Sequence, residues 1–581
     1  MRVQRTTATW LAGATIGALG LTMVAIPSAS AASKAKTVSV STEAQLRAAV
    51  ANANSRPGTD EIELKRSIAL NGAGTDGDGP EVGDLDVTDK LILDGRGHRI
   101  DANLSGRIFD VSSDAYLKLY RVSLNGGRVA DASGGAVRSS GELEVIRSSI
   151  SDSSAVGAGA SGGAIFNDGG DLYVSRSELD DNTATRAGGA IEANAGSTSL
   201  YRTSLVDNST GGGPGNGGGL HLTGAGTVSV DRSKVSGNTA SAEGGGLWNS
   251  ASGTFTVDRS SISGNSAGGN DADQGGGGLF NDGGTLTVED TDVKDNKATG
   301  TAGSGGGILN NLGTLNVDQS TIKRNSAVRA GGGIEANVGS TNVSRSSIRD
   351  NRTGGAPGNG GGVHLTGAGT VNVARTTVSG NVASSEGGGL WNSAGGTFVV
   401  ERSKVSRNVA GGNAADQGGG GLFNDGGTLT VSDTDISDNK ATGTSGSGGG
   451  ILNLGTLNVD DAEIEDNSAV RAGGGIETNG GTVDLFDVDL LDNDTGGNPG
   501  NGGGFHTTGA GVVTYEKGKV RGNSASNEGG GLWNSSTGTM TVTRVSISRN
   551  TAPVGPNVFN QPPGGTFTID GEPVPPGDNS L

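Results

Sequence analysis

The sequence predicts an all-β protein built as one parallel β-helix of about 18 coils, with three short strands in each coil. Three observations lead to this prediction. Glycine clusters, each followed by an apolar residue, recur every 25 to 32 residues from Val137 to Val558. Short Val, Ile and Leu segments alternate with polar residues, which argues against disorder. The 111 glycines come in pairs and triplets rather than at every third position, which excludes collagen.

The alternation of apolar and polar residues identifies the strands. In LTVSDTDIS, which begins at Leu429, the side chains of Leu429, Val431 and Ile436 can point to one side while Thr430 and Ser432 point to the other. This is the pattern of a strand with one buried face. Helices are disfavoured within the coils because a glycine in a helix costs about 1 kcal/mol.

The first segment, residues 1–31, has the features of a secretory signal peptide. Basic residues precede an apolar run from Trp10 to Ile26, and small residues follow up to Ala31. No later segment approaches the roughly 20 apolar residues that span a bilayer, so we expect no membrane span after signal cleavage. The absence of cysteine excludes disulfides and thiolate metal sites. We therefore expect a secreted, extracellular protein, either free or associated with the cell surface.

The rest of the chain divides into three predicted regions. Residues 32–84 form an N-terminal capping region, in which a short amphipathic helix at Glu43–Asn54 covers the open end of the core. Residues 85–570 form the β-helix. Residues 571–581 form a C-terminal tail, and the prolines there discourage further strand pairing.

The sequence also has a second period that is longer than that of the coils. Glu192, Glu335 and Glu477 are 143 and 142 residues apart, and the same spacings separate three histidines and three tryptophans. Five coils therefore make one super-repeat, with copies that start near residues 188, 331 and 473. Near-identity at this scale indicates duplication of a five-coil block.

One repeated position carries residues with chemical potential. The residue after each aligned apolar residue, here called the slot, reads Glu, His and Trp on successive coils. These slot residues are Glu192, His221 and Trp248, then Glu335, His364 and Trp391, then Glu477, His506 and Trp533. We expect the slot to point outward to solvent, with neighbouring members about 4.8 Å apart. A carboxylate beside an imidazole and an aromatic ring suits acid–base chemistry or stacking on a sugar. The alternatives are a repeated ligand-binding stripe and plain structural duplication, and we assign no catalytic residue.

An asparagine closes the third strand of each coil. Its period matches the glycine period, so we interpret these residues as a stacked structural ladder at a bend. The ladder comprises Asn182, Asn208, Asn238, Asn265, Asn296, Asn325, Asn351, Asn381, Asn408, Asn439, Asn467, Asn493, Asn523 and Asn550.

The acidic residues raise the question of a metal site. Asp290, Asp292 and Asp295 stand at nearly alternate positions, which would place them on one face of a strand. Oxygen ligands suit calcium, but no loop gathers the six or more oxygens that calcium prefers. We predict no cofactor, with calcium as the alternative, and interpret the carboxylates as a solvated acidic face.

The net charge of the chain argues against some classes of binding partner. Without the two arginines of the signal, 40 of the 42 basic residues remain against 61 acidic ones, which gives a charge of 40 − 61 = −21. Such a chain is poorly suited to binding a phosphate backbone, so we expect no nucleic-acid partner.

Several stretches resemble a known family. EAQLRAAVANAN, from Glu43 to Asn54, and LILDGRGHRIDANLSGRIFDVSS, from Leu91 to Ser113, resemble the entry segment and first coils of secreted bacterial proteins with a CSLREA-type N-terminal region. GGAI at Gly162–Ile165 resembles polymorphic outer-membrane-protein repeats. More broadly, the sequence resembles the pectate-lyase-like superfamily, and this resemblance implies a right-handed parallel β-helix. The family's cysteines and the C-terminal anchor of some members are missing from this sequence.

These observations favour a secreted, monomeric, non-enzymatic protein with a structural or adhesive role. Its expected partner is an extracellular polysaccharide or a cell-surface component, bound along the Glu/His/Trp stripe. The alternative is a carbohydrate-active enzyme of the pectate-lyase-like superfamily, either a polysaccharide lyase or a glycoside hydrolase. We favour the first because no unrepeated cluster of Asp, Arg and Lys interrupts the repeats.

Overall fold

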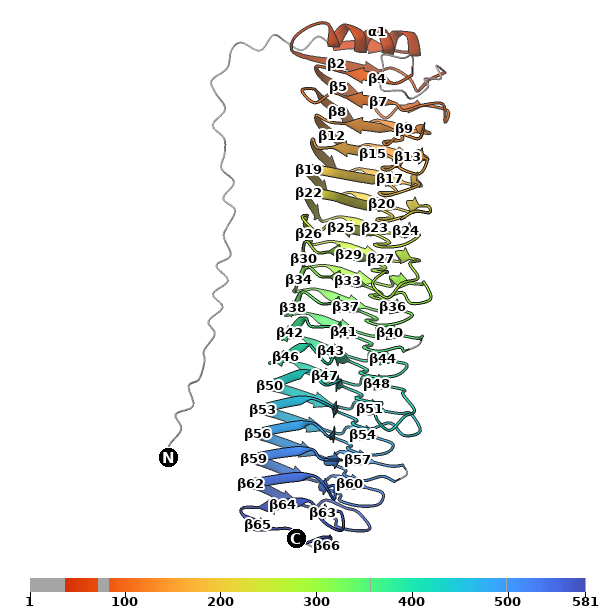
Figure 1. Ribbon diagram of the computed structural model, residues 1–581. Coiled ribbons are helices and arrows are strands. Elements are labelled where there is room, and N and C mark those ends of the chain that lie inside the picture. Colours follow the sequence, from red (N-terminus) through yellow and green to blue (C-terminus); the bar gives the residue numbers. More distant parts are fainter. Residues whose placement is uncertain (1–36, 72–82, 356, 498, 580–581) are drawn as a thin grey trace, which may run out of the picture. The chain divides into compact units, whose positions relative to one another are not determined.

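The chain folds into stacked coils of parallel β-structure (Figure 1). The structure is a computed structural model, and it describes residues 37–71, 83–355, 357–497 and 499–579. About 19 coils form one right-handed parallel solenoid, which confirms the predicted fold class. The predicted signal peptide, residues 1–31, lies outside the described residues.

A regular coil contains four strands rather than the three expected. One such coil consists of β25 (Leu247–Asn249), β26 (Thr254–Asp258), β27 (Ser261–Ser263) and β28 (Ser266–Ala267). The fourth strand has only two residues, too few for its alternation to be visible in the sequence. The first three strand types belong to a 51-stranded sheet, and the short fourth type forms a separate 15-stranded sheet.

Every coil hydrogen-bonds to the next in parallel register. β25 pairs with β29 (Leu279–Asp282), which sets Leu247 opposite Leu279, and β26 pairs with β30 (Thr285–Glu289). Residues with the same place in the repeat therefore stack directly on one another. This register turns each periodic feature of the sequence into a column along the solenoid.

The interior of the solenoid is a continuous apolar core. In β26 and β27 the inward side chains Phe255, Val257 and Ile262 are at most 1% exposed, while the alternate residues of the two strands are half-buried or exposed. Burial of one such side chain contributes roughly 1.5–3 kcal/mol. Because each coil is thin, it buries these side chains mainly against its two neighbours.

Two of the bends in each regular coil join consecutive strands through one residue with a positive φ. The bend between β26 and β27 uses Arg259 (φ 47°), and the bend between β27 and β28 uses Gly264 (φ 67°). A residue with a buried polar side chain follows each bend, Ser260 and Asn265 respectively. Residues at the first bend are here called the corner column, and this column runs from Arg96 to Arg544.

A helix covers the N-terminal end of the core. α1 spans Glu43–Asn54, and Thr42 caps it by accepting a hydrogen bond from the Gln45 backbone N–H at 3.3 Å. Leu46 and Val50 on its inner face are buried, among other residues. In the described ranges no helix has the length and apolar character needed to cross a membrane.

The ends of the solenoid differ from the predicted boundaries. β1 (Thr37–Val40) pairs with β2 (Thr59–Leu64), which pairs with β5 (Lys90–Asp94), so parallel pairing already begins inside the expected capping region. At the other end, β66 (Gly577–Asn579) pairs antiparallel with β63 (Val558–Asn560). The tail was expected to stop strand pairing, but its direction reverses and it covers part of the last open edge.

Candidate functional site

The slot residues form one continuous column along the first strand of each coil. Glu335 lies opposite His364, His364 opposite Trp391, and Trp391 opposite Phe423. Leu452 follows, and the next super-repeat then begins again with glutamate. The structure therefore brings the predicted Glu, His and Trp residues together on adjacent coils.

The glutamate of each group is held by several polar side chains. His364 Nδ1 lies 2.9 Å from Oε2 and 3.2 Å from Oε1 of Glu335, so the imidazole faces both carboxylate oxygens. The Thr366 hydroxyl donates to Oε1 at 2.7 Å. Arg329 lies 3.6 Å from the same oxygen and donates to the Ser304 hydroxyl at 3.1 Å. This network compensates the buried carboxylate.

The histidine of each group is stacked on the tryptophan. The ring centroids of His364 and Trp391 are 4.2 Å apart with an interplanar angle of 14°, and Phe423 stacks on the other face of Trp391 at 6.1 Å. The indole N–H of Trp391 donates to Glu386 at 3.1 Å. Trp391, Phe423 and Leu452 form a small apolar cluster of their own.

The slot faces away from the main core, but the expectation that it faces solvent is wrong. Glu335 is 1% exposed, His364 is 3% exposed and Trp391 is 8% exposed. The turn before each strand lies over the slot: a Cβ on Gly360 (φ 60°) would lie 2.5 Å from the Cβ of His364. The slot residues therefore fill a second buried layer, because the glycine turns cover the side of the strand that the alternation predicted to be open.

All three groups have the same geometry. The carboxylate–imidazole contacts are 2.9 Å for Glu192 with His221 and 2.6 Å for Glu477 with His506. The matching His–Trp stacks have centroid distances of 4.2 and 4.0 Å, and Trp248 and Trp533 are as enclosed as Trp391. A substrate cannot reach any of these groups without displacement of the covering turns, so the arrangement suits packing better than acid–base chemistry.

The asparagines of the predicted ladder stack on successive coils. Each amide nitrogen donates to the side-chain oxygen of the next asparagine at 2.9–3.0 Å, as from Asn351 to Asn381 and from Asn381 to Asn408. The same nitrogen donates to a backbone carbonyl, which for Asn381 is that of Ile348. The ladder runs from Asn182 to Asn550, and every member is buried. These bonds satisfy polar groups at the bend that no water reaches.

A second amide ladder was missed by the sequence analysis. Asn249 donates to Asn281 at 2.7 Å, and Asn281 donates to Asn310 at the same distance. Equivalent contacts link Asn392, Asn424 and Asn453, and link Asn534 with Asn560. The signal was present, because these residues follow the slot in LWN, LFN and ILN with the period of the coils.

The acidic residues do not share one strand face as expected. Asp290 is a corner residue with φ 45°, and Asp295 occupies the second bend with φ 57°, so only Asp292 is in a strand. Arg324 pairs with Asp295 at 2.8 Å.

The described residues bring one set of three acidic groups within metal-binding reach: Glu61, Glu63 and Asp94. Arg96 contacts Glu63, and Arg121 contacts Asp94, so cationic side chains already compensate these carboxylates.

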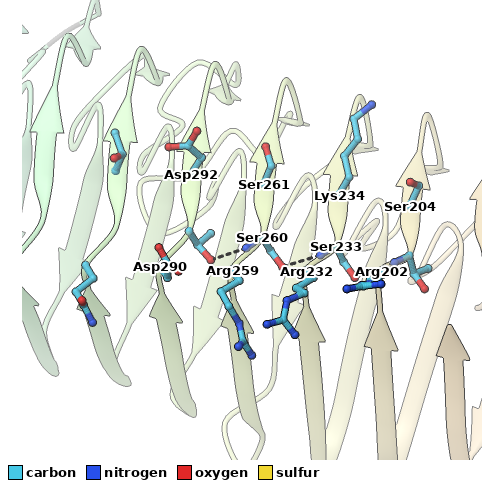
Figure 2. A pocket seen from close by; sticks show the side chains of 14 residues that line it. Arg202, Ser204, Arg232, Ser233, Lys234, Arg259, Ser260, Ser261, Asp290 and Asp292 are labelled. Atoms are coloured by element: carbon cyan, nitrogen blue, oxygen red, sulfur yellow. Dashed lines mark hydrogen bonds between the residues drawn. The ribbon is translucent and has the colours of Figure 1, made fainter. Parts of the chain in front are cut away.

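The corner column lines an open groove, another feature that the sequence analysis did not identify (Figure 2). Figure 2 shows Arg202, Arg232 and Arg259 on one side of the groove, with Ser204 and Lys234 among the residues on the other side. The sequence signal is an arginine followed by a small or polar residue once per coil, as in YRVS, IRSS, SRSE and YRTS. This pattern does not indicate a bend by itself, because arginine is an unusual residue at a position with positive φ.

Comparison with protein families gives one match. Residues 215–378 match the family model described as a right handed beta helix region. A search of curated proteins finds no match to the chain. The family match agrees with the observed coils, and the fold is compatible with the pectate-lyase-like superfamily.

Proposed function

We propose that this protein is a secreted, non-enzymatic β-helix with a structural or adhesive role, and that its surface contacts extracellular polysaccharide. One observation carries the proposal: the three Glu–His–Trp groups are enclosed and serve one another as partners. The carboxylate of Glu335, for example, is 1% exposed and contacts His364, Thr366 and Arg329. Residues used in this way stabilise the coils rather than meet a ligand.

The burial changes the part that these residues play in the proposal. A glycan can stack only on an aromatic ring whose face is accessible. Both faces of Trp391 are occupied, one by His364 and the other by Phe423. Glycan contact is therefore assigned to the outer surface of the coils, and the Glu/His/Trp stripe is assigned to their cohesion.

The test combines binding and turnover with the full chain. Wild type is incubated with a panel of soluble and insoluble polysaccharides; co-sedimentation measures binding, and reducing ends together with ultraviolet absorbance measure cleavage. We expect co-sedimentation with at least one polymer and no product. Glu335→Gln keeps the size of the side chain and removes its charge, so it should lower thermal stability and leave co-sedimentation unchanged.

Two results would overturn the proposal. Product release by wild type that disappears when Glu192, Glu335 and Glu477 are all changed to Gln would make the groups catalytic. Failure of wild type to bind any polymer would remove the adhesive role. Thr366→Val serves as a milder control, because it removes one hydrogen bond to Glu335 without changing the charge of the group.

A further inference from the structure

The groove along the corner column is basic over its first seven coils. Its corner residues there are all arginine, namely Arg96, Arg121, Arg147, Arg176, Arg202, Arg232 and Arg259. Two adjoining grooves of about 740 and 510 Å³ share Arg202 and Ser204, so they form one channel along the coils. Adjacent guanidinium groups belong to coils about 4.8 Å apart.

The arginines in the middle of this channel have no acidic partner among the described residues. Arg121 pairs with Asp94 on one side, and Arg259 lies 3.0 Å from Asp231 on the other. Between them, Arg147, Arg176 and Arg202 are exposed and form no ion pair within the described part of the chain. The residues before these three are Ile146, Ser175 and Tyr201. Asp231 and Asp258 precede the next two corner arginines, Arg232 and Arg259, and pair with them.

The backbone does not require arginine at this bend. Arg147, Arg176 and Arg202 all have φ 52°, a conformation that glycine, asparagine and aspartate adopt more readily. The same position is aspartate in later coils, at Asp433 and Asp461. Repulsion between neighbouring unpaired arginines and the unfavourable positive φ both oppose folding. We therefore infer that these arginines serve to bind a ligand.

The floor and the far wall of the channel are polar. The floor contains a ladder of buried hydroxyl groups, in which the Ser148 backbone N–H donates to the Ser177 hydroxyl at 3.0 Å. The far wall carries Ser149, Ser204 and Lys234. The acidic residues of the channel are Glu178 and, at its C-terminal end, Asp290 and Asp292. Hydroxyls and cations thus face each other across a groove that follows the axis of the coils.

We propose that this channel binds a linear anionic polysaccharide, with Arg147, Arg176 and Arg202 as its central contacts. The inference deepens the proposed adhesive function and rests on it. A guanidinium group forms paired hydrogen bonds with carboxylate, sulfate or phosphate, so the shared chemistry is one anionic group for each contact. The channel continues along several coils, so it fits an extended polymer rather than a single small ion.

A nucleic acid fits the same channel less well. Proteins hold single strands by stacking bases on aromatic side chains. The two tyrosine rings beside the corner column are already covered, by Arg121 at 4.7 Å from the centroid of Tyr120 and by Arg202 at 5.2 Å from that of Tyr201.

The experiment measures binding of the full chain to immobilised dextran sulfate, polyglucuronate, neutral dextran and single-stranded oligodeoxythymidylate over a series of salt concentrations. The variant Arg147→Asn/Arg176→Asn/Arg202→Asn removes the unpaired cations. It should keep the bend, because asparagine tolerates a positive φ. The matched control is Arg345→Asn/Arg375→Asn/Arg402→Asn, which removes three corner arginines and the same total charge from later coils. Circular dichroism verifies that both variants are folded.

We expect wild type to bind at least one of the two anionic glycans. The channel variant should raise its Kd at least about 30-fold and flatten the salt dependence, while the control should change Kd by less than about 3-fold. Preference for dextran sulfate over polyglucuronate would identify the bound anionic group as a sulfate ester rather than a carboxylate.

Each other outcome has a separate meaning. Equal weakening in both variants, or no binding to either anionic glycan, would overturn the channel assignment. Tighter binding to oligodeoxythymidylate would overturn it in favour of a nucleic acid. Binding to neutral dextran that neither variant alters would leave the adhesive function standing and remove only this inference. Cleavage products from the bound polymer would contradict the proposal that the protein is not an enzyme, while the proposal that the channel binds the polymer would still be supported.

Discussion

The slot column and the corner column follow the same coils but differ in what their side chains meet. In the slot column, His364 contacts both Glu335 and Trp391, and the same group recurs every five coils. In the corner column, Arg202 is exposed, and the matching position is Arg345 and then Asp487 in the next two super-repeats. The residue type is the same in every super-repeat at the buried slot, where neighbouring side chains constrain it. At the exposed corner the residue type varies, and the charge of the surface varies with it.

The corner column itself changes character along the solenoid. Its N-terminal part is a run of arginines, and Asp433, Asp461 and Asp487 line the equivalent groove in the C-terminal part. Cationic side chains compensate part of the acidic end, as where Lys519 contacts Asp489 at 2.5 Å. The unbroken arginine run thus begins in coils that precede the first duplicated block, which starts near residue 188.

The largest effect should come from opening the slot column. Trp391→Ala removes a side chain that packs between His364 and Phe423, so it should lower the free energy of unfolding by about 3–5 kcal/mol. Urea unfolding followed by circular dichroism measures the change. Trp391→Phe keeps an aromatic ring in the stack and should cost clearly less; equal losses for both variants, or a loss below about 1 kcal/mol for alanine, would contradict the buried stack.

A pH-dependent effect of intermediate size should arise at the edge of the slot column. Burial raises the pKa of Glu243 from 4.5 to about 7, although the indole N–H of Trp248 donates to its carboxylate and opposes this shift. The folded state therefore binds an extra proton between about pH 4.5 and 7. This contribution to stability is greatest below pH 4.5, declines as the pH rises to 7 and is constant above it.

Urea unfolding of wild type and of Glu243→Gln at several pH values isolates this effect. The difference between the two proteins should change between pH 4.5 and 7 and then become constant. Tryptophan fluorescence of the folded wild type should titrate with a midpoint near 7, because Trp248 contacts the ionising group. A stability difference that does not vary with pH would show that Glu243 is not enclosed.

The smallest effect should come from the corner column. Arg375 is exposed with φ 49°, and asparagine adopts this conformation more readily than arginine, so Arg375→Asn should change the free energy of unfolding by less than about 0.5 kcal/mol. Arg375→Val places a β-branched residue at the same bend and should cost about 1 kcal/mol or more. A large loss for asparagine would mean that the corner side chains support the fold, which would erase the contrast with the slot column.

The period of the sequence allowed much of this structure to be predicted. It set the coils, the positions at which asparagines face one another and the neighbourhood of Glu335, His364 and Trp391, because parallel in-register pairing places equivalent residues on adjacent coils. The helix at Glu43–Asn54 was also recognisable from its own residues. Short strands such as Ser266–Ala267 were not, since two residues carry no alternation.

The amino-acid sequence by itself determined which side chains become neighbours along the solenoid, because that depends only on the repeat length. The tertiary structure decided which of them meet water. His364 is covered because the turn at Gly360 folds over the strand, whereas Arg176 is exposed and forms no ion pair in the described part of the chain. Burial and charge pairing depend on contacts between segments that the period does not specify, so the sequence identified the Glu–His–Trp groups while the structure showed that they are enclosed.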